Sequence, residues 1–172
     1  MNFPQDNKAE NEKKINIYSE AELRQKENSI GNNAIKKKVN ILIAEDSEAD
    51  FILLLRELKK GSFILEYKTV DKISDFENEI RKNVYDIIIS DFNLRGFDAF
   101  NILSSLKIHN ANIPIIICSG TVGEEKAVQL MKEGATDFLL KDNLKRLNTI
   151  IDRLINEIEE KTLNKTQIKE SE

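Results

Sequence analysis

The sequence is poor in the residues that build disulfide scaffolds, metal–thiolate sites and flexible hinges. Its 172 residues include one cysteine, one histidine, two prolines, six glycines and no tryptophan. A single cysteine, Cys118, excludes an internal disulfide and a cysteine metal cluster. Because Cys118 ends an apolar run, we expect it in the core and not as a reactive thiol.

Long apolar runs and an excess of positive charge are also missing. The longest apolar runs, 51–55 and 113–118, fall far short of the roughly 20 residues of a membrane-spanning helix. Residues 1–10 are polar and contain no signal-peptide apolar region. The net charge is −4, and basic residues are interleaved with acidic ones. We therefore expect a cytoplasmic protein with no nucleic-acid partner and no membrane insertion.

The length allows one folded domain with tails. An apolar content of 40% is enough for one core of ordinary size. Residues 1–38 are rich in Asn, Lys and Glu, which predicts a largely disordered amino-terminal arm with a short, marginal helix from Ser19 to Asn28. The folded domain is predicted over 39–161 and a flexible polar tail over 162–172. We expect no second folded domain and no output domain.

Strand-like and helix-like segments alternate along this domain. Apolar segments typical of strands occur at 39–44, 63–70, 85–91, 113–118 and 138–140. Helices are predicted between these strands from apolar residues at helical spacing and from helix caps. The caps are predicted at Ser47, at Ser74 together with Glu77, and at Asp98. A further helix is predicted from Gly123 to Glu133. This alternation predicts an α/β fold: a doubly wound, five-stranded parallel sheet with helices on both faces.

A carboxylate ends the central strand. Residues Ile87 to Ile89 form a β-branched run, the pattern of a strand covered on both faces, and the strand stops at Asp91. Ligands of open α/β sheets bind outside the carboxyl ends of the strands. From this stretch alone, Asp91 is either a site for chemistry or a loop aspartate that caps local structure.

Polar side chains follow four of the predicted strands. In chain order these are Glu45 with Asp46, then Asp91, then Ser119 with Gly120, and finally Lys141. A strand order of 2-1-3-4-5 places the switch point between the first and third strands, which brings the three acids together. Three carboxylates in one crevice repel one another, and the usual resolutions are raised pKa values or a bound cation. Hard oxygen donors with no His or Cys beside them favour Mg²⁺.

A lysine and a hydroxyl complete this predicted constellation. Lys141 opposes the acids and can pair with one of them or with a phosphoryl oxygen, and Ser119 supplies a neutral donor. Phosphoryl transfer is mostly positioning and charge neutralisation. An acid nucleophile, a divalent cation, a lysine and a hydroxyl donor are therefore a workable set for accepting a phosphoryl group.

Four segments together resemble the receiver domain of two-component response regulators. They are 41–46 (ILIAED), 91–94 (DFNL), 113–120 (IPIIICSG) and 134–141 (GATDFLLK), and the resemblance covers about 39–161. It implies a flavodoxin-like fold and a phosphoprotein in which Asp91 accepts a phosphoryl group from a phosphohistidine. The implied partners are a sensor histidine kinase or a histidine phosphotransfer protein, together with a downstream protein target.

The resemblance also implies a metal site. Mg²⁺ would be held by Asp46, Asp91 and the main-chain carbonyl of Asn93, with Glu45 helping through water. The expected activity is that of a signal-transduction switch, a phosphorelay member or a phosphate sink, three roles that the sequence does not separate. Its self-catalysed phosphoryl transfer and autodephosphorylation would be weak, so it is not a turnover enzyme. We expect a monomer or a weak homodimer.

The same resemblance assigns the remaining site residues. Lys141 would contact the phosphoryl oxygens, and Ser119 would donate a hydrogen bond to one of them. Phe138 would be the ring that turns inward when Ser119 moves. Asn93 and Thr121 would flank the water that attacks during dephosphorylation.

Two positions depart from the family pattern. Asp142 follows the strand-five lysine where the family often has a proline with a cis bond, so we expect a trans bond there. Arg95 stands where the family often has proline, and it is either a positive charge near the site or a solvated loop tip. Residues 141–144 (KDNL) resemble receivers found alone or attached to sensor kinases.

The last apolar stripe predicts a helix of roughly 18 residues. Its members recur at steps of three and four: Leu144, Leu147, Ile151, Leu154 and Ile158. The stripe can pack on the sheet, which we favour, or its distal part can form a seam with a partner helix. From Lys161 the sequence turns polar, and the helix is expected to fray there.

Two other functions remain open. A phosphorylation-independent interaction module of the same fold is the main alternative, although the intact set of acids, Ser119 and Lys141 argues against it. A flavodoxin-like hydrolase or oxidoreductase ranks last, because the sequence contains neither a glycine-rich dinucleotide turn nor a Ser-His-acid set.

Overall fold

The computed structural model describes residues 36–121 and 123–170. The strands are β1 (Lys38–Ala44), β2 (Ile64–Val70), β3 (Ile87–Asp91), β4 (Asn93–Leu94), β5 (Phe97–Asp98), β6 (Ile115–Ser119) and β7 (Asp137–Leu140). The helices are α2 (Glu48–Leu58), α3 (Ile73–Lys82), α4 (Ala99–Ile108), α5 (Glu124–Glu133), the 3-10 helix η1 (Lys141–Arg146) and α6 (Leu147–Glu170). The helix predicted near Ser19 lies outside the described residues, as does most of the predicted arm 1–38.

The main sheet has five parallel strands in the order β2-β1-β3-β6-β7. Because β6 and β7 are the fourth and fifth strands of this sheet, the predicted order 2-1-3-4-5 is confirmed. From β1 the chain turns to β2 on one side, while β3 lies on the other side. The switch point therefore lies between β1 and β3, where Ala44 is the register partner of Ser90.

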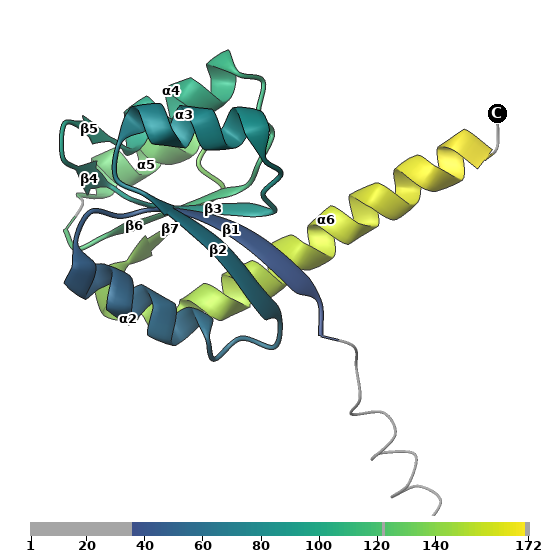
Figure 1. The fold of residues 1–172 in the computed structure, drawn as a ribbon, viewed down its shortest axis with the longest axis horizontal. Helices are drawn as coiled ribbons and strands as arrows, with labels where there is room; N and C mark the ends of the chain where they lie inside the picture. The colour runs from purple at the N-terminus through teal and green to yellow at the C-terminus, as the bar shows by residue number, and fades with distance from the viewer. Residues whose placement is uncertain (1–35, 122, 171–172) are drawn as a thin grey trace, which may run out of the picture. The chain divides into compact units, whose positions relative to one another are not determined.

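Helices cover both faces of the sheet (Figure 1): α2 and α6 lie on one face, and α3, α4 and α5 lie on the other. Alternate residues of β1 supply the two cores. Leu42 packs with Phe76 of α3 and Ile102 of α4, whereas Ile41 and Ile43 pack with the helices of the opposite face. Burial of these apolar side chains is the main favourable contribution to folding.

The central strands are almost fully buried, and the edge strand is not. Every residue of β6 is buried, as are Ile87 to Ser90 of β3. By contrast, β2 buries only Val70 completely. A strand inside a parallel sheet covered by helices has no solvent face, which explains the isoleucine runs of β3 and β6.

Local capping explains most helix starts, with one correction. The Ser47 hydroxyl caps α2, and the Asp98 carboxylate caps α4 in a capping box. The predicted capping box of Ser74 and Glu77 is wrong, because α3 begins at Ile73 after Lys72, whose side chain makes no capping hydrogen bond. Ile73 packs against the core, which favours starting the helix one residue before Ser74.

The last helix is longer than predicted. The predicted length of roughly 18 residues is wrong, since α6 has 24 residues and continues beyond Lys161 to Glu170. Residues 159–168 are exposed but contain neither glycine nor proline, and the hydroxyls of Thr162 and Thr166 donate hydrogen bonds to carbonyls one turn earlier. The proximal stripe packs on the sheet through Leu147, Ile151 and Leu154, as favoured from the sequence.

Two further predictions concern the described part of the chain. Its peptide bonds are all trans, including that between Lys141 and Asp142. None of its helices combines the length and apolar character needed to cross a membrane.

Candidate functional site

Three carboxylates lie together at the carboxyl ends of β1 and β3. Glu45 and Asp46 follow β1 directly, and Asp91 is the last residue of β3. Each contributes an oxygen, and these oxygens all lie within 4.8 Å of one another. The three acids therefore lie close together, as predicted, and their oxygens can hold a metal ion.

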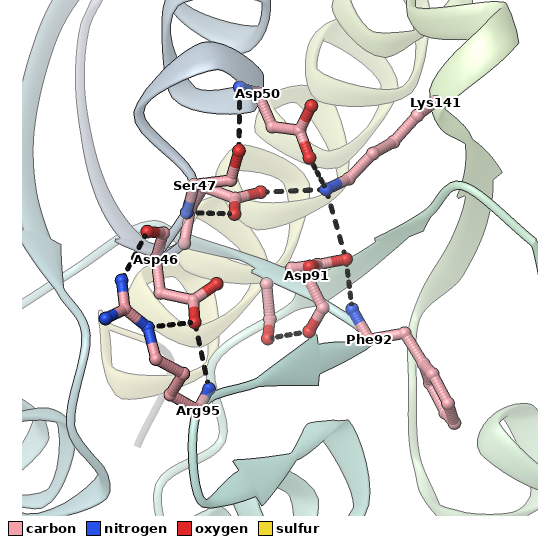
Figure 2. A network of polar contacts seen from close by, with 9 residues as sticks. Asp46, Ser47, Asp50, Asp91, Phe92, Arg95 and Lys141 are labelled. Atoms are coloured by element: carbon pink, nitrogen blue, oxygen red, sulfur yellow. Dashed lines mark hydrogen bonds and ion pairs between the residues drawn. The ribbon is translucent and has the colours of Figure 1, made fainter.

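Lys141 reaches this group from the end of β7. Its Nζ lies 3.0 Å from Glu45 Oε2 and 3.2 Å from Asp91 Oδ1. The same nitrogen lies 2.6 Å from Oδ2 of Asp50, in the first turn of α2 (Figure 2). Only 18% of the Lys141 side chain is exposed, so its ammonium joins three carboxylates in a largely buried setting.

Burial and charge shift the pKa values of these groups. Burial raises the pKa of Asp91 and of Glu45 above their ordinary values, although the neighbouring Lys141 lowers both. Burial alone would lower the pKa of Lys141, but its hydrogen bonds to Asp50 and Glu45 and the charge of Asp91 outweigh burial and raise the pKa above its ordinary value. Lys141 is therefore an ammonium at neutral pH, a fixed positive charge beside Asp91.

The amino terminus of α2 holds Glu45 in place. The backbone N–H of Ser47 donates a hydrogen bond of 2.9 Å to Glu45 Oε1. The Ser47 hydroxyl in turn accepts one of 3.3 Å from the N–H of Asp50, which caps the helix. The same turn therefore orients both Glu45 and Asp50 toward Lys141.

A small cavity of about 30 Å³ is lined in part by Glu45 and Asp50. Asp91 and Lys141 line it together with apolar side chains of α2, and Cys118 lines its sheet side. The volume suits about one water molecule. Burial raises the pKa of the Cys118 thiol to about 12, so the thiol is not a nucleophile at neutral pH, in agreement with its predicted core role.

A short hairpin follows Asp91. Strands β4 and β5 pair antiparallel, Asn93 with Asp98 and Leu94 with Phe97. Gly96 in the turn has φ of 84°, a left-handed value that glycine adopts at low cost. The hairpin brings Arg95 to Asp46, so Arg95 places a positive charge at the site although its side chain is largely exposed to solvent. Asn93 is the first residue of β4, and the role of its carbonyl stays a prediction.

The other predicted residues surround the acids at different depths. Ser119 ends β6, is 2% exposed, and is the register partner of Leu140, the residue before Lys141. Thr121 is exposed in the loop before α5. Phe138 is half-buried and packs on the core of the α3, α4 and α5 face. Their predicted roles in switching and dephosphorylation remain untested.

Asp50 is a site residue that the sequence patterns did not predict. Its only local signal is its position three residues after the capping Ser47, in the first turn of a helix, where an acid is common for reasons unrelated to a site. Its contact with Lys141 joins residues far apart in sequence and depends on how α2 packs.

A model of the response regulator receiver domain matches residues 41–152. The chain belongs to this family. The match includes every predicted site residue. The family predicted from the sequence is therefore confirmed, and the observed strand order agrees with it.

The receiver is also similar to regulators of known name. It is 29% identical over 110 residues to the transcriptional regulatory protein ZraR of Salmonella typhimurium, covering 62% of this chain and 24% of ZraR. It is 33% identical over 103 residues to the swarming motility regulation protein RssB of Serratia marcescens, covering 60% of this chain and 46% of RssB. The chain thus spans less than half the length of either relative.

Solved receiver domains share the fold. The receiver domain of Francisella response regulator 1452 superimposes with a TM-score of 0.63 at 21% identity, covering 70% of this chain and 98% of that domain. This likeness confirms the predicted flavodoxin-like receiver fold.

Proposed function

We propose that this receiver accepts a phosphoryl group on Asp91 from a phosphohistidine of a partner histidine kinase or phosphotransfer protein. The phosphorylated form then alters binding to a downstream protein or passes the phosphoryl group onward in a phosphorelay. The proposal makes the chain an acceptor and a switch, with weak self-catalysed chemistry, and not a turnover enzyme.

One observation carries the proposal: the Asp91 carboxylate lies 3.2 Å from the Lys141 ammonium in the crevice at the switch point. The Asp91 side chain is 14% exposed, so a small phosphodonor or a partner's imidazole can approach it. A carboxylate placed beside a fixed cation, at the edge where parallel sheets bind ligands, suits nucleophilic attack on phosphorus.

The transfer itself is a displacement at phosphorus. An ionised oxygen of Asp91 forms the new P–O bond while the P–N bond to the donor imidazole breaks, and the imidazole nitrogen keeps the electron pair of the broken bond. Lys141 offsets the negative charge of the phosphoryl oxygens, and Ser119 supplies a hydrogen-bond donor.

The donor set fits Mg²⁺. Three carboxylates offer oxygens within 4.8 Å of one another, and Mg²⁺ prefers hard oxygen ligands and often binds through one or two carboxylates. Asp46, Asp91 and the Asn93 carbonyl would hold the ion, with Glu45 acting through water. When bound, the ion neutralises charge on the transferring group.

The remaining predicted roles follow from this reaction. Ser119 and Phe138 form the proposed switch, with Ser119 responding to the phosphoryl group and the Phe138 ring following. Asn93 and Thr121 flank the water that removes the phosphoryl group. The proposal keeps the predicted cytoplasmic location and the predicted monomer or weak homodimer.

The test is incubation of the purified chain with acetyl phosphate, with and without Mg²⁺, followed by intact mass. We expect one added phosphoryl group that requires Mg²⁺ and is absent from Asp91→Asn. The matched control Asp75→Asn removes an exposed acid from the first turn of α3 and should be phosphorylated like the wild type. A folded wild-type chain that gains no phosphoryl group with Mg²⁺ present would favour the phosphorylation-independent module instead.

A further inference from the structure

Arg95 binds one of the three acids of the site through three donors (Figure 2). Its backbone N–H donates to Asp46 Oδ2 at 3.0 Å, and its Nε donates to the same oxygen at 3.2 Å. Its Nη2 lies 3.4 Å from the main-chain carbonyl oxygen of Asp46. Arg95 is therefore paired with Asp46, one of the carboxylates proposed to bind the metal ion.

The two cationic side chains near the site, Lys141 and Arg95, pair with different acids. Among the described residues, Lys141 forms ion pairs with Glu45 and Asp91, whereas Asp46 has its ion pair with Arg95. Lys141 comes from the end of β7 and is largely buried, but Arg95 comes from the β4–β5 hairpin and its side chain is 85% exposed. The cation on Asp46 is thus the more easily displaced of the two.

The exposure of this pair sets its strength. An ion pair in which one side chain is almost fully in water is weak, because solvent screens the charges and the long side chain loses freedom on pairing. A divalent cation bound directly by Asp46 and Asp91, with Glu45 acting through water, outcompetes such a pair, because it interacts with all three acids at once. The guanidinium can then move into solvent while the Arg95 backbone N–H still orients the Asp46 carboxylate.

We propose that Arg95 is a built-in counter-cation that competes with the divalent cation for Asp46 and so weakens metal binding. The inference rests on the proposed Mg²⁺-dependent function and adds a residue that sets the affinity of that site. The opposite role, in which the guanidinium holds Asp46 in place for the metal, predicts the opposite change when Arg95 is replaced.

The test is calorimetric titration of Mg²⁺ into the unphosphorylated full chain, without any phosphodonor. The variant Arg95→Gln keeps the backbone donor and removes the charge, and Arg95→Lys keeps the charge. The control Arg81→Gln removes an arginine whose side chain donates hydrogen bonds to the carbonyl of Glu77 and the side chain of Asn78, both within α3. Asp46→Asn identifies the site and should abolish the binding.

We expect Arg95→Gln to bind Mg²⁺ about two- to fivefold more tightly than the wild type, as loss of a weak ion pair implies. Arg95→Lys and Arg81→Gln should stay close to the wild type. In the wild type, the Nε–H resonance of Arg95 should shift as Mg²⁺ is added, because its partner is lost.

Two outcomes overturn different claims. Equal or weaker Mg²⁺ binding by folded Arg95→Gln, with wild-type binding intact, overturns the counter-cation role and leaves the proposed function standing. Absence of Mg²⁺ binding in the wild type and in Arg95→Gln alike overturns the metal part of the proposed function, and this inference falls with it.

Discussion

The ammonium nitrogen of Lys141 lies 2.6 Å from a carboxylate oxygen of Asp50, closer than it lies to Asp91. Asp50 therefore competes for the cation that the proposed reaction needs at the phosphoryl group. The Asp50 side chain is 37% exposed, which makes it the most solvent-accessible of the three carboxylates around Lys141.

Replacing Asp50 with asparagine should speed phosphorylation. The change releases Lys141 and removes a negative charge that repels an anionic phosphodonor. We expect Asp50→Asn to react with acetyl phosphate about two- to fivefold faster, since partly exposed ion pairs contribute about 0.2–1 kcal/mol. The control Glu48→Gln removes an exposed carboxylate from the same helical turn and should change the rate less. A slower reaction in Asp50→Asn would mean that Asp50 positions Lys141 productively.

Loss of Lys141 should destabilise the fold. Glu45, whose side chain is only 4% exposed, would lose its ion-pair partner, as would Asp91. We expect Lys141→Ala to lower the free energy of unfolding by about 1–3 kcal/mol at pH 7 without divalent cations, because a buried acceptor is left without its donor. Urea unfolding with a chelator present measures this.

The control for that experiment is Lys107→Ala. Lys107 pairs with Glu133 at the surface, where the two side chains are 58% and 46% exposed. Its loss should leave the unfolding midpoint nearly unchanged. Equal effects of the two substitutions would show that burial at the site does not strengthen the Lys141 interactions.

The stability of the fold should depend on pH through Asp91. Burial raises the pKa of Asp91 in the folded chain above the ordinary value of 3.8, so the folded state binds the proton more tightly than the unfolded state. The resulting stabilisation is present below 3.8 and is lost as the pH rises through the folded pKa. At neutral pH the ionised carboxylate therefore destabilises the fold.

Asp91→Asn should consequently unfold at a higher temperature than the wild type at neutral pH. The difference between their midpoints should shrink as the pH falls toward 3.8, measured with a chelator present. A difference that grows on acidification would contradict the raised pKa.

The two halves of α6 should contribute unequally to stability. Leu154 is 1% exposed and packs on the sheet, whereas Leu163 is 63% exposed. We expect Leu154→Ala to lower the free energy of unfolding by about 2–5 kcal/mol, the range for a buried leucine. Leu163→Ala should change it by less than about 0.5 kcal/mol. Circular dichroism during denaturant unfolding distinguishes the two.

The sheet and its acids could be predicted because their signals are local. The isoleucine runs of β3 and β6 identify buried strands, and the polar residue that ends each run marks the ligand-binding edge. Strand order then brought Glu45, Asp46 and Asp91 together before any distance was known.

The contacts of Asp50 and Arg95 could not be predicted in the same way. Asp50 reaches Lys141 only because of the packing of α2, and Arg95 reaches Asp46 only because a hairpin of two-residue strands turns at Gly96. The start of α3 was missed for a related reason. Ile73, partly buried against the core, is the first residue of α3, so the helix starts before the serine that local preference favours as its cap.

The position of Cys118 gives the chain a probe of its own. Cys118 is the register partner of Asp91, is 3% exposed, and is the chain's one cysteine. A thiol reagent can reach it only when the sheet beneath the acids opens, so its labelling rate, compared with that of a free thiol, measures the free energy of that opening. Labelling with and without Mg²⁺ or phosphoryl donor would therefore report how tightly each ligand closes the site, with no foreign label introduced.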